Sequence, residues 1–189
     1  GATLTGPLAP FGYATVGPIA EGAFSRVMRA RHAATGAEVA VKSFCTRARS
    51  VRTAMHLKDM RLEMQTLRYV ASAGGHAHVA NVVEVCEGRG WVHCALEYCG
   101  GGSLRRLIDA SIRTGGVAEA VALPLLEQLG SALTFLHELR VAHRDVKPTN
   151  VLFSDGSQRV VKLCDFGFAV RCGADEKLKA GCGTPLYMA

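Results

Sequence analysis

The chain has 189 residues, 49% of them hydrophobic and 20% charged, which excludes the composition of a disordered protein and allows a packed core. Its formal net charge of +6 allows an anionic ligand, but Lys and Arg gather only in 47–61, which we interpret as a solvated helix face. We therefore expect no nucleic-acid partner. No apolar run is long enough to span a membrane, and residues 1–12 are expected to be a loose leader, without the pattern of a secretory signal.

The first half of the chain predicts a small β-sheet. Short β-like runs cover 13–20, 24–32 and 38–44, with small residues at the turns between them. Two further strands are expected at 82–86 and 91–97, joined by a turn that contains glycine.

A helix is predicted between the third and fourth of these strands, because apolar residues recur there at spacings of three and four. Gly74 and Gly75 should end it. The residues of its apolar face are Leu57, Met60, Met64, Leu67 and Ala71.

The sequence YCGGGS interrupts the strand pattern, and we place a hinge at 97–102. Ser103 can cap a short helix over 104–111, and a longer helix should cover 119–139. Two short strands, 151–153 and 160–164, should flank the following turn. The residues expected on the buried side of the long helix are Ala122, Leu125, Leu129, Leu133 and Leu136.

The sequence HRDVKPTN, residues 143–150, places an acid, cations and an amide directly after this helix. Phosphoryl transfer needs such groups: a carboxylate to accept the hydroxyl proton, a cation for the phosphoryl group and hard oxygen ligands for Mg²⁺. Asp145 and Lys147 suit the first two roles, and Asn150 with Asp165 suits the metal. Each residue alone would equally be explained as a turn or cap residue. The combined pattern, with DFG following Asp145 by about 20 residues, favours catalysis.

With these motifs the chain resembles the eukaryotic protein kinases, and specifically their serine/threonine branch, with a similarity to calmodulin-dependent-like and polo-like kinases near the end. The matching pieces occur in family order: AEGAFSRV (20–27), VAVK (39–42), Glu63, HVANVVEV (78–85), LEYCGGGSL (96–104), HRDVKPTN (143–150), DFG (165–167) and GTPLYMA (183–189).

The resemblance implies an α+β, two-lobe fold of the protein-kinase type. Its N-lobe, 13–96, would hold a five-stranded antiparallel sheet plus one helix. The hinge at 97–102 would lead to an incomplete, mainly helical C-lobe, 103–189, that ends in the activation segment. The family continues past GTPLYMA with further helices, so we interpret the chain as a fragment and expect apolar surface to be exposed on the 119–139 helix.

The resemblance also implies an ATP and Mg²⁺ site. Lys42 would hold the α- and β-phosphates and Glu63 would pair with it. Taken alone, Lys42 could be a solvent-facing strand end and Glu63 an exposed helix residue. Asp145, Lys147 and Asn150 would be catalytic, and Asn150 and Asp165 would bind Mg²⁺.

Further ATP-binding residues follow from the resemblance. The phosphate-covering loop keeps only Gly22 of its three family glycines, with Ala20 in place of another, so a plain hairpin turn remains an alternative. Leu96 would gate the back of the adenine pocket, and Glu97 and Cys99 would offer backbone groups to the purine. The residues expected to sandwich the ring are Val27, Ala40 and Leu152, although core burial would also explain them.

Regulation is expected to depend on Arg144 and Thr184. The segment 168–183 contains no Ser, Thr or Tyr that could be phosphorylated to pair with Arg144. Our hypothesis is that Asp175 or Glu176 supplies a constant negative charge instead; a solvated turn explains these acids equally well. Thr184 matches a threonine that contacts the protein substrate.

Seven cysteines show neither a CxxC pair nor metal-type spacing. We interpret them as reduced thiols of a cytosolic or nuclear protein. They are Cys45, Cys86, Cys94, Cys99, Cys164, Cys172 and Cys182.

Two functions compete. The first is an ATP-dependent serine/threonine kinase with a protein substrate. The second is a catalytically silent, kinase-like fragment that binds nucleotide or protein. A dinucleotide oxidoreductase is rejected, because Gly22 lies between two predicted strands and not between a strand and a helix.

Overall fold

The chain forms two compact units, one comprising Gly1–Met64 and Asn81–Tyr98 and the other Gln65–Ala80 and Cys99–Ala189. The predicted boundaries of the two lobes and the hinge (13–96, 97–102 and 103–189) stay predictions. The computed structural model describes residues 8–21, 25–47, 51–88, 90–173 and 182–188, with the backbone alone for 51–54 and 56.

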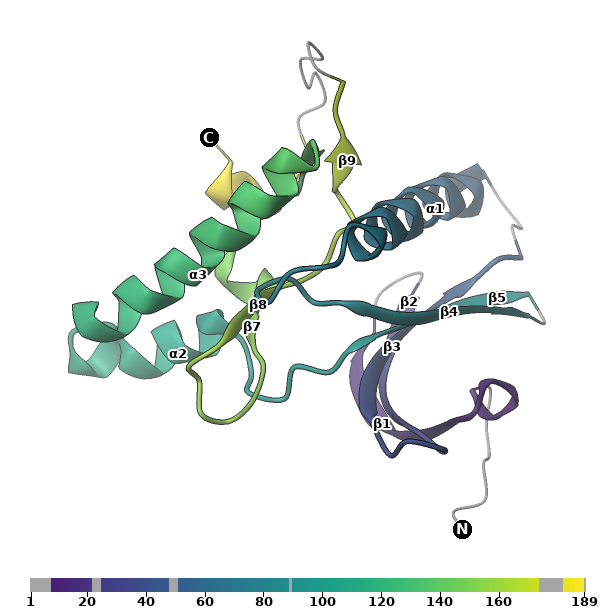
Figure 1. Ribbon diagram of the computed structural model, residues 1–189, viewed down its shortest axis with the longest axis horizontal. Helices are drawn as coiled ribbons and strands as arrows, with labels where there is room; N and C mark the ends of the chain where they lie inside the picture. The colour runs from purple at the N-terminus through teal and green to yellow at the C-terminus, as the bar shows by residue number, and fades with distance from the viewer. Residues whose placement is uncertain (1–7, 22–24, 48–50, 89, 174–181, 189) are drawn as a thin grey trace. The chain divides into compact units, whose positions relative to one another are not determined.

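The first unit contains a five-stranded antiparallel sheet with the strand order β1-β2-β3-β5-β4 (Figure 1). The predicted α+β kinase-type fold class is therefore confirmed, and each predicted strand of this sheet is present. The strands are β1 Tyr13–Glu21, β2 Ser25–His32, β3 Glu38–Cys45, β4 Val82–Gly88 and β5 Trp91–Glu97.

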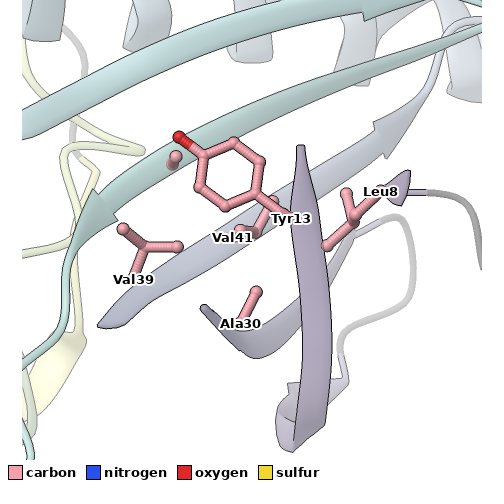
Figure 2. Packing of buried hydrophobic residues seen from close by; sticks show 6 residues of the cluster. Leu8, Tyr13, Ala30, Val39 and Val41 are labelled. Carbon is pink, nitrogen blue, oxygen red and sulfur yellow. The ribbon is translucent and has the colours of Figure 1, made fainter. Parts of the chain in front are cut away.

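One face of this sheet is covered by the residues that precede β1. Leu8 is only 2% exposed, and a short 3-10 helix, Ala9–Phe11, leads into β1. Residues 8–12 therefore differ from the loose leader predicted for 1–12, because Leu8 buries its side chain against the sheet. Residues 1–7 lie outside the described part of the chain. The cluster in Figure 2 consists of Leu8, Tyr13, Ala30, Val39, Val41 and Ala95.

Helix α1, Val51–Ser72, begins six residues before the predicted apolar face and ends before Gly74, whose φ of 96° favours glycine. Met60, Met64 and Leu67 are buried as predicted. Ala71, predicted on the same face, is exposed, and the neighbouring Val70 is buried in its place.

The second unit contains two further helices, α2 Leu104–Ser111 and α3 Glu119–Glu138, both predicted from the sequence. Ser103 caps α2 by accepting a hydrogen bond from the Arg106 N–H. Four short strands complete the unit, of which the pair β6–β9 was not predicted because two-residue strands carry no periodic pattern. They are β6 Val141–Ala142, β7 Val151–Phe153, β8 Val161–Leu163 and β9 Val170–Arg171.

Helix α3 buries Leu125, Ala132 and Leu136. The predicted core residues Ala122, Leu129 and Leu133 are only half-buried. Its other side exposes apolar side chains, as the sequence predicted; they are Val121, Leu123 and Leu126.

The α3 residue Gln128 holds the turn between β7 and β8. Its Nε2 donates to the Arg159 carbonyl, and its Oε1 accepts from the Val161 N–H, both over 2.9 Å. Helix α3 thus supports the hairpin that follows the HRDVKPTN loop. Among the described residues, no helix has the length and apolar character needed to cross a bilayer.

Candidate active site

The strand register places the predicted nucleotide-binding residues of the first unit on one face of the sheet. Directly paired residues of antiparallel strands share a face, and residues two apart along a strand do so too. Val27 pairs with Lys42, and Ala40 pairs with Leu96. Ala20 pairs with Val27 and joins the same face. This face is opposite the one that buries Val39 and Val41.

Lys42 and Glu63 form an ion pair, with Lys42 Nζ 2.6 Å from Glu63 Oε1. The side chains are 16% and 5% exposed, so the solvent-facing alternatives for both are excluded. The pair joins the central strand β3 to helix α1. The buried carboxylate of Glu63 therefore holds the Lys42 ammonium group in one position.

The end of β5 leads into the predicted hinge. The Glu97 N–H donates to the Asn81 carbonyl over 2.8 Å, and the Asn81 N–H donates to Glu97 Oε2 over 3.3 Å. Leu96 and Cys99 are half-buried. These bonds fix the backbone of Glu97, and its N–H is already hydrogen-bonded to Asn81. A purine contact from Glu97 would therefore use its carbonyl oxygen.

In the second unit, Asp145 is 5% exposed and its carboxylate accepts three hydrogen bonds. Thr184 Oγ1 donates to Oδ1 over 2.7 Å, Asn150 Nδ2 donates to Oδ2 over 2.9 Å, and Lys147 Nζ lies 2.7 Å from Oδ2. Burial by itself raises the pKa of Asp145, but the hydrogen bonds from Lys147, Thr184 and Asn150 outweigh it and hold the pKa below its ordinary value. Asp145 is therefore an ionised carboxylate at neutral pH.

Asn150 connects this carboxylate to the DFG segment. Its Nδ2 also donates to the Asp145 backbone carbonyl over 3.0 Å, so its side-chain oxygen is its acceptor group. The backbone carbonyl of Asn150 accepts from the Cys164 N–H over 2.9 Å. Asp165 follows directly and is exposed, with φ at 61°. A carboxylate and an amide oxygen are ligands that Mg²⁺ accepts, so this donor set fits the metal.

His143 is a buried residue whose role the sequence analysis missed. Its Nε2 donates to the Cys164 carbonyl over 3.0 Å, and its Nδ1 accepts the Asp145 N–H over 3.3 Å, which is consistent with a neutral ring protonated at Nε2. Burial lowers the pKa of His143. Its ring also contacts Phe166 edge-on at 5.0 Å. Its place in the HRD triplet was the available signal.

Gly183 was also missed, although it directly precedes Thr184. A Cβ at this position would lie 2.5 Å from the Arg144 carbonyl oxygen, and its φ is 116°. Only glycine allows the backbone to approach the HRDVKPTN loop, residues 143–150, this closely. The close approach places the Thr184 hydroxyl between Asp145 and Lys147.

Arg144 has a described partner other than the predicted acids. Its Nε donates to the Phe168 carbonyl over 2.7 Å, and its φ of 64° turns the loop there. The acids Asp175 and Glu176, like Gly22 of the phosphate-covering loop, lie outside the described residues.

The predicted site residues thus form two sets. Lys42, Glu63 and the sheet face belong to the first unit, whereas the second set belongs to the second unit. Leu152, predicted to contact the adenine with Val27 and Ala40, lies in β7 of the second unit and is half-buried. The second set consists of Asp145, Lys147, Asn150, Asp165 and Thr184.

Comparison with known proteins gives the same family. The protein kinase domain model matches residues 13–189. CBL-interacting protein kinase 22 of Oryza sativa subsp. japonica is 35% identical over 90% of this chain and 41% of its own length. Serine/threonine-protein kinase ATG1c of Arabidopsis thaliana is 33% identical over 90% of this chain and 22% of its own.

A mouse relative is similar to the same degree. The phosphorylase b kinase gamma catalytic chain, liver/testis isoform, of Mus musculus is 34% identical over 90% of this chain and 41% of its own length. The chain thus spans less than half the length of these three relatives. The family match and the arrangement of Asp145, Lys147 and Asn150 lead to one conclusion: the chain belongs to the protein kinase domain family.

Proposed function

We propose that this chain carries the catalytic residues of a serine/threonine protein kinase, which transfers the γ-phosphoryl group of Mg·ATP to a hydroxyl group of a protein. The main observation that supports this proposal is the buried Asp145 carboxylate, which is kept ionised by hydrogen bonds from Lys147, Thr184 and Asn150. The names of the relatives, among them a serine/threonine-protein kinase, support the choice of acceptor.

In this proposal Asp145 accepts the proton of the substrate hydroxyl as the hydroxyl oxygen bonds to the γ-phosphorus and the bond to the ADP oxygen breaks. The lowered pKa leaves Asp145 ionised at neutral pH, so its carboxylate is available to accept this proton. Lys147, 2.7 Å from Asp145 Oδ2, provides positive charge beside the transferring group.

The phosphates and the metal would be bound by two different groups of side chains. Lys42, oriented by Glu63, would bind the α- and β-phosphates. Asn150 Oδ1 and the Asp165 carboxylate would hold Mg²⁺, which when bound neutralises charge on the phosphate oxygens. Gly22 and Ala20 would cover the phosphates.

The purine would bind to the end of β5. The Glu97 carbonyl and the Cys99 backbone would face its polar edge, behind which Leu96 would limit the pocket. Val27, Ala40 and Leu152 would contact its faces. Arg144 and Thr184 would position the segment that receives the protein substrate. A cytosolic or nuclear location remains a prediction from the cysteine pattern.

The test is transfer of labelled phosphate from Mg·ATP to Ser or Thr of a generic basic protein. We expect transfer by the natural chain and a loss of at least about 100-fold in Asp145→Asn. A thermal-shift measurement with Mg·ATP should show binding in both proteins. Nucleotide binding without phosphate transfer in the natural chain would favour the alternative of a catalytically silent fragment that binds nucleotide. If the natural chain showed neither binding nor transfer, a nucleotide function would be refuted.

A further inference from the structure

Arg29, in β2, makes contacts that the nucleotide and catalytic groups do not explain. Its Nη2 donates to both Glu38 oxygens over 2.7 Å. Its guanidinium carbon lies 4.7 Å from the centre of the Tyr98 ring. Tyr98 follows Glu97, the last residue of β5. The guanidinium therefore links the outer part of the sheet to the first residue beyond β5.

The register puts this link on the nucleotide face of the sheet. Arg29 pairs with Ala40, and Ala40 pairs with Leu96, so Arg29 shares their face. Glu38 lies two residues before Ala40 and points to the same side. Tyr98 stands between Glu97 and Cys99, the two residues proposed to bind the purine through their backbones.

The hydrogen bonds of Arg29 alone do not account for its placement. Its Nε is buried and, among the described residues, has no hydrogen-bond partner. An arginine in an ion pair would normally satisfy this donor, because leaving it buried and unpaired is unfavourable. The contact that accounts for the placement is the cation–π interaction of the guanidinium, whose carbon lies over the Tyr98 ring.

We propose that Arg29 is a positioning residue for the purine-binding backbone: anchored by Glu38, its guanidinium stacks on Tyr98 and fixes the chain at Tyr98–Cys99. The proposal rests on the proposed function. It predicts that Arg29 influences recognition of the adenine end of ATP and leaves recognition of the phosphates unchanged, because the phosphates are assigned to the separate ion pair of Lys42 with Glu63.

The experiment measures binding of two ligands, adenosine and Mg·tripolyphosphate, to the full 189-residue chain. Arg29→Met and Tyr98→Leu should each weaken adenosine binding by about two- to tenfold. The double variant should be no weaker than either single one, since both remove the same contact. Tripolyphosphate affinity should stay unchanged in all three.

Two controls are matched to these variants. Tyr98→Phe keeps the ring and should bind adenosine normally. Arg31→Met removes the other arginine on Glu38, whose Nη2 lies 3.1 Å from Oε1, without touching the ring of Tyr98. It should also leave adenosine binding unchanged. A general weakening of the sheet would lower the affinity for both ligands and would contradict the proposal.

Amide hydrogen exchange of the ligand-free chain separates this proposal from the proposed function. Arg29→Met should speed exchange at Tyr98 and Cys99 relative to the natural chain and to Arg31→Met. Faster exchange in a chain that binds no adenosine would refute the proposed function and keep the positioning role. Unchanged exchange in Arg29→Met would overturn the positioning role, whatever the chain binds.

Discussion

Thr184 Oγ1 donates a hydrogen bond to Asp145 Oδ1 over 2.7 Å, although 39 positions separate the two residues. Lys147 Nζ donates to the same hydroxyl oxygen over 2.8 Å. A hydroxyl group can accept from the ammonium and donate to the carboxylate at once, which no aliphatic side chain of similar size can do. The Thr184 hydroxyl group thus connects the segment after DFG to the HRDVKPTN loop, residues 143–150.

Replacing Thr184 by Val should lower phosphoryl transfer by about tenfold, since each lost hydrogen bond to a charged group weakens the arrangement. One of the bonds that lower the pKa of Asp145 also disappears, so that pKa should rise. The acid limb of the pH–rate profile should shift to higher pH. Thr184→Ser, which keeps the hydroxyl, is the control; an unshifted limb in Thr184→Val would contradict this assignment.

The stability of the chain should fall as the pH drops below about 6.5, the ordinary pKa of histidine. Burial lowers the pKa of His143, so the unfolded chain takes up a proton at a pH where the folded chain does not. The stabilisation is therefore present above about pH 6.5 and is lost as the pH falls toward the folded pKa.

Urea unfolding at pH 7.5 and 5.5 measures this loss. His76 and His93, whose pKa values are also lowered by burial, add to it in the natural chain. His143→Gln should be less stable than the natural chain at pH 7.5 but should lose less stability on acidification. His137→Gln, which replaces an exposed histidine of α3, is the control for the substitution itself. Equal pH dependence in His143→Gln would refute this contribution.

Lys42 and Glu63 should be energetically coupled. Removing either partner leaves a mostly buried charge, so Lys42→Met and Glu63→Gln should each destabilise the chain by about 1–3 kcal/mol. The double variant should lose less free energy of unfolding than the two single variants lose together. Chemical unfolding of all four proteins measures the coupling.

The exposed pair Arg26 and Glu21 provides the comparison for this cycle. Its atoms lie 2.7 Å apart, close to the 2.6 Å between Lys42 and Glu63, but the side chains of Arg26 and Glu21 are 60% and 69% exposed. Water screens such a pair. The double-mutant cycle of Arg26 and Glu21 should therefore show no measurable coupling energy. Equal coupling energies in the two cycles would mean that burial of Lys42 and Glu63 has no effect on their interaction.

Gly183→Ala should disrupt the docking of Thr184 on the catalytic loop. The added Cβ meets the Arg144 carbonyl, and the φ of 116° is itself strained for alanine by about 1–3 kcal/mol. We expect a loss of phosphoryl transfer larger than that of Thr184→Ser. Gly156→Ala is the control, since its Cβ would meet nothing within 4 Å, and it should keep full activity. Normal transfer by Gly183→Ala would show that this close approach is not required.

The local sequence pattern was sufficient to predict the helices and strands that have a clear apolar pattern or a clear signal at their ends. The short, mainly apolar run of β5 and the Ser103 cap of α2 placed both elements to the residue, because each signal acts within a few positions of the chain. The pair β6–β9 was missed, since Val141 and Arg171 meet only when the chain between them has folded.

The sequence by itself determined which residues were proposed for phosphoryl transfer: Lys42, Asp145, Asn150 and Asp165 were predicted from their chemistry and from the order of the motifs. Only the tertiary structure decided what surrounds them. The hydrogen bond of His143 to Cys164, the close approach of Gly183 to the Arg144 carbonyl and the position of the Arg29 guanidinium over the Tyr98 ring join residues distant in sequence. Hydrogen bonds and burial depend on distances in space, and spacing along the chain does not encode those distances until the strands and loops have packed.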